Sequence, residues 1–213
     1  MNTTPTPRPD APWNAAPSPS DSPAWHRRIC VVGDRIALSG DLPVDERLAR
    51  RALLGWRDAG ITGVVDCRGE WSDQSLVGRV TPQVAYRHVG INDDGTRRPN
   101  DWFDTGTSAA LELLGSTDGR VLVHCHMGIN RCPSMAYAVL LTLGWHHVAA
   151  LDAIRGARQI AALIYAEDAM AWWTRRSGIP ATVAGAMRRD VRNWHRANDI
   201  DVATVIRRIR RAS

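Results

Sequence analysis

Long apolar segments, cysteine and lysine are scarce or absent in this sequence. The longest nearly apolar stretch, residues 135–145, is too short to span a bilayer, and the N-terminus lacks the apolar core of a signal peptide. Four cysteines in 213 residues do not make a disulfide scaffold, so we expect a reducing, cytoplasmic setting. Because lysine is absent, all 27 basic residues are arginines, which stay charged and bind phosphate or carboxylate as a fork.

The remaining composition is that of a globular protein. Apolar residues make up 44% and charged residues 23%, which excludes collagen, a coiled coil and wholesale disorder. The length suits one domain with some chain left over. The net charge of +5 is unevenly placed, because residues 176–213 contain nine arginines and three aspartates while residues 27–175 are neutral overall. The positive charge therefore belongs to the C-terminal part of the chain.

The chain divides into a leader, a body and an extension. Residues 1–24 are rich in Pro, Ser and Thr and have almost no aliphatic side chains, so we expect a disordered leader. Residues 25–175 form the body. Strands are expected at 29–32, 35–38, 61–67, 83–89 and 120–124, and helices at 43–58, 100–114, 134–143 and 148–158. This alternation predicts an α/β fold with a partly parallel central sheet flanked by helices.

One motif in the body carries chemistry. The expected strand at 120–124 ends at His124, Cys125 follows, and Arg131 precedes the next helix. The five residues between them are His126, Met127, Gly128, Ile129 and Asn130. A loop of this length can curl its backbone N–H groups inward and bind a phosphate dianion at the helix N-terminus. The same field favours a thiolate, so we expect the pKa of Cys125 to fall below that of a free thiol.

The segment HCHMGINRCPS resembles the signature loop of the cysteine-based protein tyrosine phosphatases, and the short body is similar to their dual-specificity branch. The resemblance covers about residues 27–170. It implies that Cys125 attacks phosphorus to form a cysteinyl-phosphate and that Arg131 binds the phosphate and stabilises the transition state. It implies no metal and no other cofactor, because the loop supplies the positive field.

The resemblance also implies a general acid on a loop upstream of the signature. Residues 90–95 form such a loop, and Asp93 lies 32 residues before Cys125, a spacing that fits the dual-specificity branch. The neighbouring Asp94 is the alternative acid. Spacing favours Asp93, and geometry is needed to separate the two carboxyl groups.

Other residues near the signature are expected to support it. His124, Cys132 and Ser134 are assigned to the loop network. Cys132 stands where the family usually has Ser or Thr, and its weaker donor predicts slow hydrolysis of the phosphoenzyme. In some relatives a cysteine at the position of Cys67 traps the oxidised nucleophile as a disulfide, so Cys67 is a candidate redox partner of Cys125. Cys132 is a second candidate partner, and a buried apolar role for Cys67 is the alternative.

Several residues admit competing interpretations. A zinc site from His124, Cys125, His126 and Cys132 is an alternative to the phosphate loop, although its spacing fits no common ligand pattern. Arg155 and Arg158 are most simply surface salt-bridge residues, and a position flanking the cleft is the alternative. Trp71 and Trp102 lie in expected loops near the cleft, where they are candidate substrate contacts.

Residues 176–213 lie outside the resemblance, and their pattern of apolar residues predicts two helices. Apolar residues recur at helical spacing from Val183 to Trp194 and again from Ile200 to Ile209, and Asn198 is the expected cap of the second helix. The simplest interpretation is a packing helix pair with a solvated basic face. Docking to an acidic partner, to nucleic acid or to a membrane surface is the alternative.

The leading functional hypothesis is a metal-independent phosphatase. Its expected substrates are phosphotyrosine and/or phosphoserine and phosphothreonine in proteins. The loop has no basic residue besides Arg131 and the neighbouring histidines, which argues against a polyphosphorylated lipid. The alternatives are a phosphatase of non-protein phosphates, such as nucleotides, RNA 5′ ends, sugars or lipids, and a phosphate-binding module with little turnover.

Overall fold

A computed structural model describes residues 25–212, and the expected disordered leader at 1–24 lies outside the described residues. Five strands form one sheet in this part of the chain, in the order β1-β2-β5-β3-β4. They are β1 (Cys30–Val32), β2 (Ile36–Ser39), β3 (Ile61–Arg68), β4 (Ala85–Ile91) and β5 (Arg120–His124). β1 pairs with β2 in an antiparallel sense and the other neighbours are parallel, so the predicted α/β fold with a partly parallel sheet is confirmed.

The central strand β5 ends at the signature loop. It pairs with β2 on one side, where Val123 lies opposite Leu38, and with β3 on the other, where Val123 lies opposite Val65. All three side chains are fully buried. A parallel strand covered on both faces is expected to be continuously apolar, which explains the sequence of β5.

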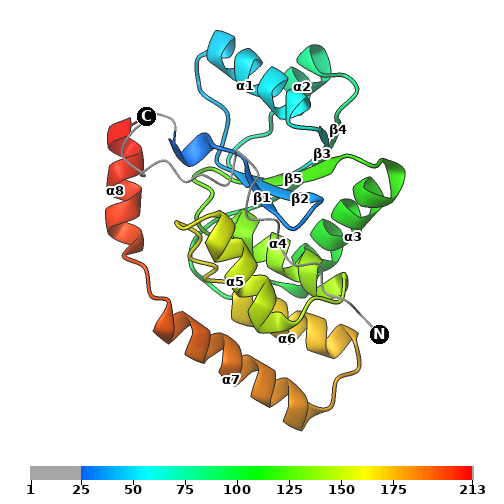
Figure 1. Cartoon of the computed structure of the whole chain (residues 1–213), viewed down its shortest axis with the longest axis vertical. Coiled ribbons are helices and arrows are strands. Elements are labelled where there is room, and N and C mark those ends of the chain that lie inside the picture. Colours follow the sequence, from blue (N-terminus) through cyan, green and yellow to red (C-terminus); the bar gives the residue numbers. More distant parts are fainter. Residues whose placement is uncertain (1–24, 213) are drawn as a thin grey trace.

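Helices cover both faces of the sheet (Figure 1). One face carries α1 (Glu46–Asp58) and α2 (Gln74–Val80), and the other carries α3 (Asn100–Ser116), α4 (Arg131–Thr142), α5 (His147–Ala157) and α6 (Ala166–Arg176). The sequence patterns did not predict α2 or α6. The Asp45 side chain caps α1 by accepting from the Leu48 N–H at 2.9 Å, so this helix begins after the cap and not at Pro43.

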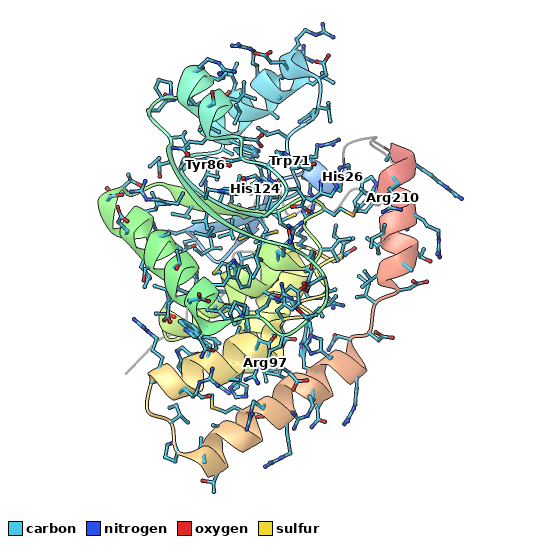
Figure 2. The ribbon with its side chains drawn as sticks, turned by 180° about the vertical axis from the view of Figure 1, so that it is seen from behind. His26, Trp71, Tyr86, Arg97, His124 and Arg210 are labelled. Atoms are coloured by element: carbon cyan, nitrogen blue, oxygen red, sulfur yellow. The ribbon has the colours of Figure 1, made fainter. Side chains whose placement is uncertain are left out.

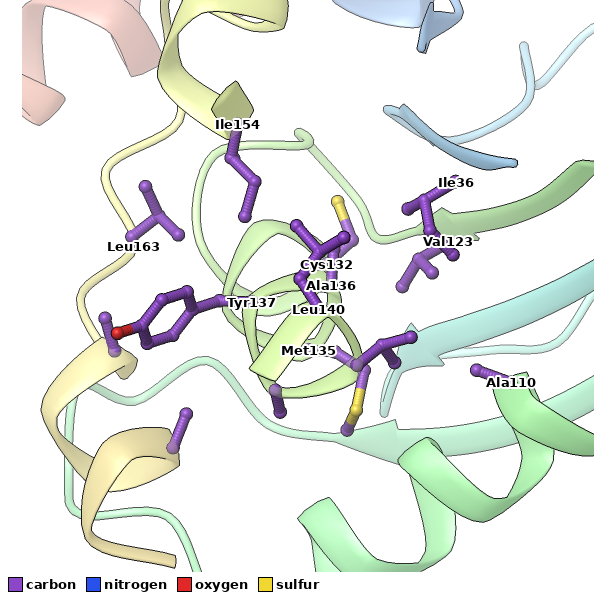
Figure 3. Close-up of a cluster of buried hydrophobic side chains, with 14 of the residues drawn as sticks. Ile36, Ala110, Val123, Cys132, Met135, Ala136, Tyr137, Leu140, Ile154 and Leu163 are labelled. Carbon is purple, nitrogen blue, oxygen red and sulfur yellow. The ribbon is translucent and has the colours of Figure 1, made fainter. Parts of the chain in front are cut away.

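Helix α4 is the centre of the larger core. Figure 3 shows Met135 and Leu140 of this helix among side chains from the sheet and from neighbouring helices, including Val123 and Ile154. Nearly every residue of α4 is buried, from Arg131 onward. The helix start is thereby fixed by packing, and with it the position of the signature loop that leads into it.

The C-terminal extension consists of α7 (Ala181–Ala197) and α8 (Val202–Ala212), as the apolar spacing predicted. α7 packs on the body through Val191 and Trp194. Asn198 ends α7 and does not cap α8, because the Asp201 side chain is the group that accepts from the Thr204 N–H, at 2.9 Å. None of the helices in the described residues is long and apolar enough to cross a membrane.

Candidate active site

The signature loop is wrapped around an inward-facing set of N–H groups. Gly128 has φ +67°, and a Cβ at this position would lie 2.0 Å from Nη2 of Arg158, so only glycine fits here. Backbone N–H groups of other segments hold the outward carbonyls, with Asp41 donating to His126 at 2.9 Å and Ala162 to Ile129 at 2.7 Å. Because C=O and N–H point in opposite directions across a planar peptide, outward carbonyls leave N–H groups on the inner side.

Arg158 holds the same loop from behind. Its Nε donates to the Gly128 carbonyl at 2.6 Å, and its Nη2 donates to the carbonyls of Met127 at 3.2 Å and His26 at 2.7 Å. Only 3% of the residue is exposed. The expectation of a surface salt bridge is therefore wrong for Arg158. It is also wrong for Arg155, which donates to the carbonyls of Ala161 and Asn198.

Cys125 is a buried thiol whose surroundings favour the ionised form. Burial would raise its pKa, but a hydrogen bond from the Cys132 thiol, the charge of Arg131 and the Cys132 N–H more than offset burial and lower the pKa to about 6. The sulfur atoms of Cys125 and Cys132 are 3.3 Å apart. Burial and the neighbouring Cys125 raise the pKa of Cys132 well above its usual value, so Cys132 remains a donor at neutral pH.

Arg131 is aimed by a carboxylate that the sequence analysis missed. Its Nη1 and Nη2 donate to the two carboxylate oxygens of Glu70 at 2.7 and 2.9 Å, and Nη1 also donates to the Ile91 carbonyl at 2.8 Å. Within residues 25–212, its buried Nε meets no hydrogen-bond acceptor. Oδ2 of Asp93 lies 3.4 Å from this Nε. Nε and the second N–H of Nη2 are thus the two donors of Arg131 that have no hydrogen-bond partner in the described residues, and such a pair fits two oxygens of a phosphate.

The two candidate acids occupy different surroundings. Oδ1 of Asp93 accepts from Asn130 Nδ2 at 2.7 Å and from the Tyr165 hydroxyl at 2.6 Å, which holds the carboxyl group against the signature loop. Asp94 instead binds Thr96 and Arg98, and hydrogen bonds from the Thr96 backbone and side chain, followed by Arg98, lower its pKa to about 2. The structure therefore brings Asp93 to the loop and leaves Asp94 in a surface turn.

His126 and Trp71 border the loop on its open side. Nδ1 of His126 lies 2.8 Å from Oδ2 of Asp41, a hydrogen bond that raises the pKa of the imidazole. The exposed ring of Trp71 packs edge-on against His126, with centroids 5.3 Å apart, so Trp71 is beside the site as expected (Figure 2). Trp102 does not lie beside the site, because it is buried in α3 and its Nε1 donates to the Val89 carbonyl.

His124 does not support the thiolate. Side chains alternate across a strand, and its ring faces the α1 side, where it packs against Trp56 with centroids 5.4 Å apart. Nε2 lies 3.6 Å from Oδ1 of Asp66. Burial lowers the pKa of His124 to about 4, so the ring is neutral. The zinc alternative is wrong for the same reason, because His124 and Cys125 point to opposite faces of the sheet.

Ser134 and Cys67 lie close to the loop in different ways. The Ser134 hydroxyl donates to Oδ1 of Asn130 at 3.3 Å and accepts from the Tyr165 N–H, which ties the start of α4 to the loop and to Tyr165. Cys67 is fully buried and follows the residue that pairs with His124, so it lies next to Cys125 across β3 and β5. A redox pairing of Cys125 with either Cys67 or Cys132 stays a prediction.

Sequence reasoning did not name Glu70, Tyr165 or Asp41 as site residues, and its simplest interpretation of Arg158 was a surface role. Each of these four residues lies at least 30 residues from the site residue that it contacts. The one usable signal was for Glu70, which follows the parallel strand β3 at the edge where β5 also ends.

No protein-family model matches the sequence, and no curated protein matches it. Solved structures do match its fold. Human DUSP28 is 20% identical, covering 70% of this chain and 95% of its own, with a TM-score of 0.56. A mouse dual-specificity phosphatase complexed with zinc tungstate is 20% identical over 77% of this chain and 95% of its own, with a TM-score of 0.58. PTPMT1 in complex with PI(5)P is 18% identical over 70% and 97%, with a TM-score of 0.56. The chain thus has the dual-specificity phosphatase fold, as the resemblance of its signature loop implied.

Proposed function

We propose that this protein is a cysteine-dependent phosphatase that hydrolyses phosphomonoesters through a cysteinyl-phosphate. The observation that carries the proposal is the Cys125 thiol with its pKa lowered to about 6, at the base of a loop closed by Arg131. At neutral pH this sulfur is mostly thiolate, which is the form that attacks phosphorus. Asp93, which Asn130 and Tyr165 hold at the same loop, is the general acid that the reaction needs besides the thiolate and the arginine.

The reaction has two steps. In the first, the Cys125 thiolate bonds to phosphorus while the bond from phosphorus to the leaving oxygen breaks, and that oxygen takes the proton of Asp93. In the second, water attacks the phosphocysteine and gives a proton to Asp93, and the thiolate leaves with phosphate released. Arg131 stabilises the oxygens of the transferred group in both steps.

We propose phosphorylated proteins of the cytoplasm as the substrates. The signature loop carries no Lys and no Arg before Arg131, so it offers a single fixed cation to the phosphate. The second candidate is a non-protein phosphate, and the observation that favours it is the structural likeness to PTPMT1, whose complex contains PI(5)P.

The first experiment measures phosphate release from para-nitrophenyl phosphate in the presence of EDTA. We expect turnover in the wild type and none in Cys125→Ser. Asp93→Asn should lower kcat by about 10²–10⁴-fold, the usual contribution of a general acid. Asp94→Asn is the matched control, because it removes a neighbouring carboxylate that faces away from the loop, and its kcat should stay near that of the wild type. Activity that survives in Cys125→Ser, or that EDTA abolishes, would overturn the proposal.

A substrate panel separates the two substrate classes. Phosphotyrosine, phosphoserine and phosphothreonine peptides are compared with PI(5)P in vesicles at equal phosphate concentration. Higher kcat/KM on the peptides supports the protein substrate, and higher kcat/KM on the lipid supports the second candidate. A wild-type protein that binds phosphopeptide with neither a burst nor turnover would be a binding module.

A further inference from the structure

The C-terminal helix α8 packs against the signature loop itself. Its buried residue Ile209 belongs to a small apolar cluster with Ile129 of the loop and with Ala162. Half-buried side chains complete the cluster, and they are Trp25, Met127, Ile160, Ile200, Val202, Val205 and Ile206. Figures 1 and 2 both show α8 running beside the short helical turn η1 (Trp25–Arg27), which contains His26. The extension therefore contacts the loop from which the candidate site is built.

The opposite face of α8 is basic. Arg207, Arg208, Arg210 and Arg211 are all exposed. In the described part of the chain, none of the four forms an ion pair with an acidic side chain, and Arg207 donates to the Thr204 hydroxyl at 2.6 Å. These four charges give α8 a positive surface next to a body, residues 27–175, that is neutral overall.

The packing of α8 limits what this helix can bind. An amphipathic helix that binds a membrane inserts its apolar face into the lipid. Here Ile209 is 3% exposed and that face is covered by the signature loop and its neighbours. Only the arginine face is available, which favours a partner recognised by negative charge.

The cluster that joins α8 to the signature loop forms an apolar strip. Met127, Trp25 and Ile160 are its half-buried members outside the C-terminal extension, and residues 126–130 include no Lys or Arg. A nucleic-acid strand carries a phosphate at every nucleotide, so it would place one over this apolar strip. A peptide can place an apolar side chain there and an acidic side chain beyond it, against the arginines.

Resting on the phosphatase function stated above, we propose that the arginines of α8 bind acidic side chains that flank the phosphorylated residue of a protein substrate. The extension thereby sets the substrate class. The preferred substrates are phosphopeptides with Asp or Glu on one side of the phosphorylated residue. The guanidinium groups bind these carboxylates as forks at the rim of the site, while Arg131 binds the phosphate.

The test compares kcat/KM for phosphopeptides that differ only in their flanks. One carries acidic residues before the phosphorylated residue, one carries them after it, and one has alanine on both sides. At low ionic strength, we expect the wild type to prefer one acidic peptide by about tenfold, the sum of a few exposed ion pairs. The preference should shrink as salt screens these charges.

Three variants test whether the α8 arginines cause this preference. Changing Arg207, Arg208, Arg210 and Arg211 to Gln should bring the ratio of acidic to neutral peptide down to about one. The matched control changes the same number of charges on α1, by replacing Arg47, Arg50, Arg51 and Arg57 with Gln, and should keep the wild-type ratio. Replacing the α8 arginines with Glu should reverse the preference toward peptides with basic flanks, a gain that unfolding of α8 cannot produce.

Equal kcat/KM for acidic and neutral peptides in a wild type that turns over both would overturn the proposal. So would a preference for a 5′-phosphorylated oligonucleotide that disappears in the glutamine variant, because that outcome identifies nucleic acid as the partner. A wild type that fails to hydrolyse para-nitrophenyl phosphate and every peptide would remove the phosphatase function on which the proposal rests.

Discussion

At the residue scale, the proposed mechanism gives Cys132 the task of stabilising the sulfur of Cys125 as it leaves. The sulfur atoms of Cys132 and Cys125 are 3.3 Å apart, and once Cys125 is ionised only the Cys132 thiol can donate across this contact. A thiol donates more weakly than a hydroxyl. When water displaces the sulfur from phosphocysteine, negative charge returns to Cys125 and needs a donor. A weak donor stabilises this charge less, so the second step is expected to be slow.

We therefore expect Cys132→Ser to speed hydrolysis of the phosphoenzyme, because its hydroxyl is the stronger donor. Rapid mixing with para-nitrophenyl phosphate measures both steps, since a slow second step produces a burst of para-nitrophenol followed by a slower phase. The wild type should show the burst, and Cys132→Ser should show a faster slow phase. Cys132→Ala, which removes the donor, should show a slower one. An unchanged slow phase in Cys132→Ser would contradict this account.

The site residues that the sequence could predict are those contained in one short segment. Cys125, Arg131 and Cys132 lie in a continuous motif, whose strand–loop–helix setting places them without any long-range information. Spacing favoured Asp93 over Asp94, but the partners that hold Asp93 at the signature loop come from elsewhere in the chain and could not be read from the spacing. The assignment of Asp93 as the acid stays a prediction.

At the scale of elements, the end of β3 is held by a buried ionic network. Arg68 is fully buried, and its guanidinium donates to Asp66 at 2.9 and 2.7 Å and to Asp73 at 2.6 Å. Tyr86 also donates to Asp66. Two residues after Arg68 stands Glu70, which holds Arg131. The network thus positions the segment that aims the phosphate-binding arginine.

Removing one partner from this ionic network should lower the free energy of unfolding. Asp66→Ala leaves the Arg68 charge buried with a single remaining carboxylate, and we expect a loss of about 3–5 kcal/mol in the free energy of unfolding. The double variant Asp66→Ala, Arg68→Met removes both charges and should recover part of this loss. Urea unfolding of both variants measures the difference. A loss below about 1 kcal/mol in Asp66→Ala would mean that the pair behaves like an exposed one.

The elements themselves were predictable to different degrees. Strand β5 matched its expected bounds, because three consecutive apolar residues, Val121 to Val123, follow a turn and leave few alternatives. Helix α2 was missed because it has only seven residues and contains Gly78, so its sequence has no clear helical period. Helix α2 is held in place by Val77, which is buried in the cluster on the α1 side of the sheet.

At the scale of the whole molecule, the division into a neutral body and a basic extension was evident from the sequence, and the docking of the extension was not. The spacing of the apolar residues predicted the apolar face of α8. The surface on which this face packs could not be predicted, because it combines Trp25, the signature loop and residues near Ala162, which are far apart in sequence. Such a surface exists only after the body has folded.

Two buried histidines predict how the stability of the molecule depends on pH. Burial is the first cause that lowers the pKa of both His26 and His124 to about 4, whereas a histidine in the unfolded chain titrates near 6.5. Between these values the unfolded chain binds more protons than the folded one, so stability rises with pH in this range. The stabilisation is complete above about pH 6.5 and is lost as the pH falls toward 4.

We expect His124→Phe to weaken this dependence. Neither ring nitrogen of His124 has a hydrogen-bond partner among residues 25–212, and phenylalanine can keep the packing against Trp56. The loss of unfolding free energy between pH 6.5 and 4.5 should become smaller by about 1.4 kcal/mol per pH unit at most. His146→Asn, a change at an exposed histidine, is the matched control and should follow the wild-type curve. Parallel curves for the wild type and His124→Phe in urea unfolding would show that His124 takes up its proton without unfolding the chain.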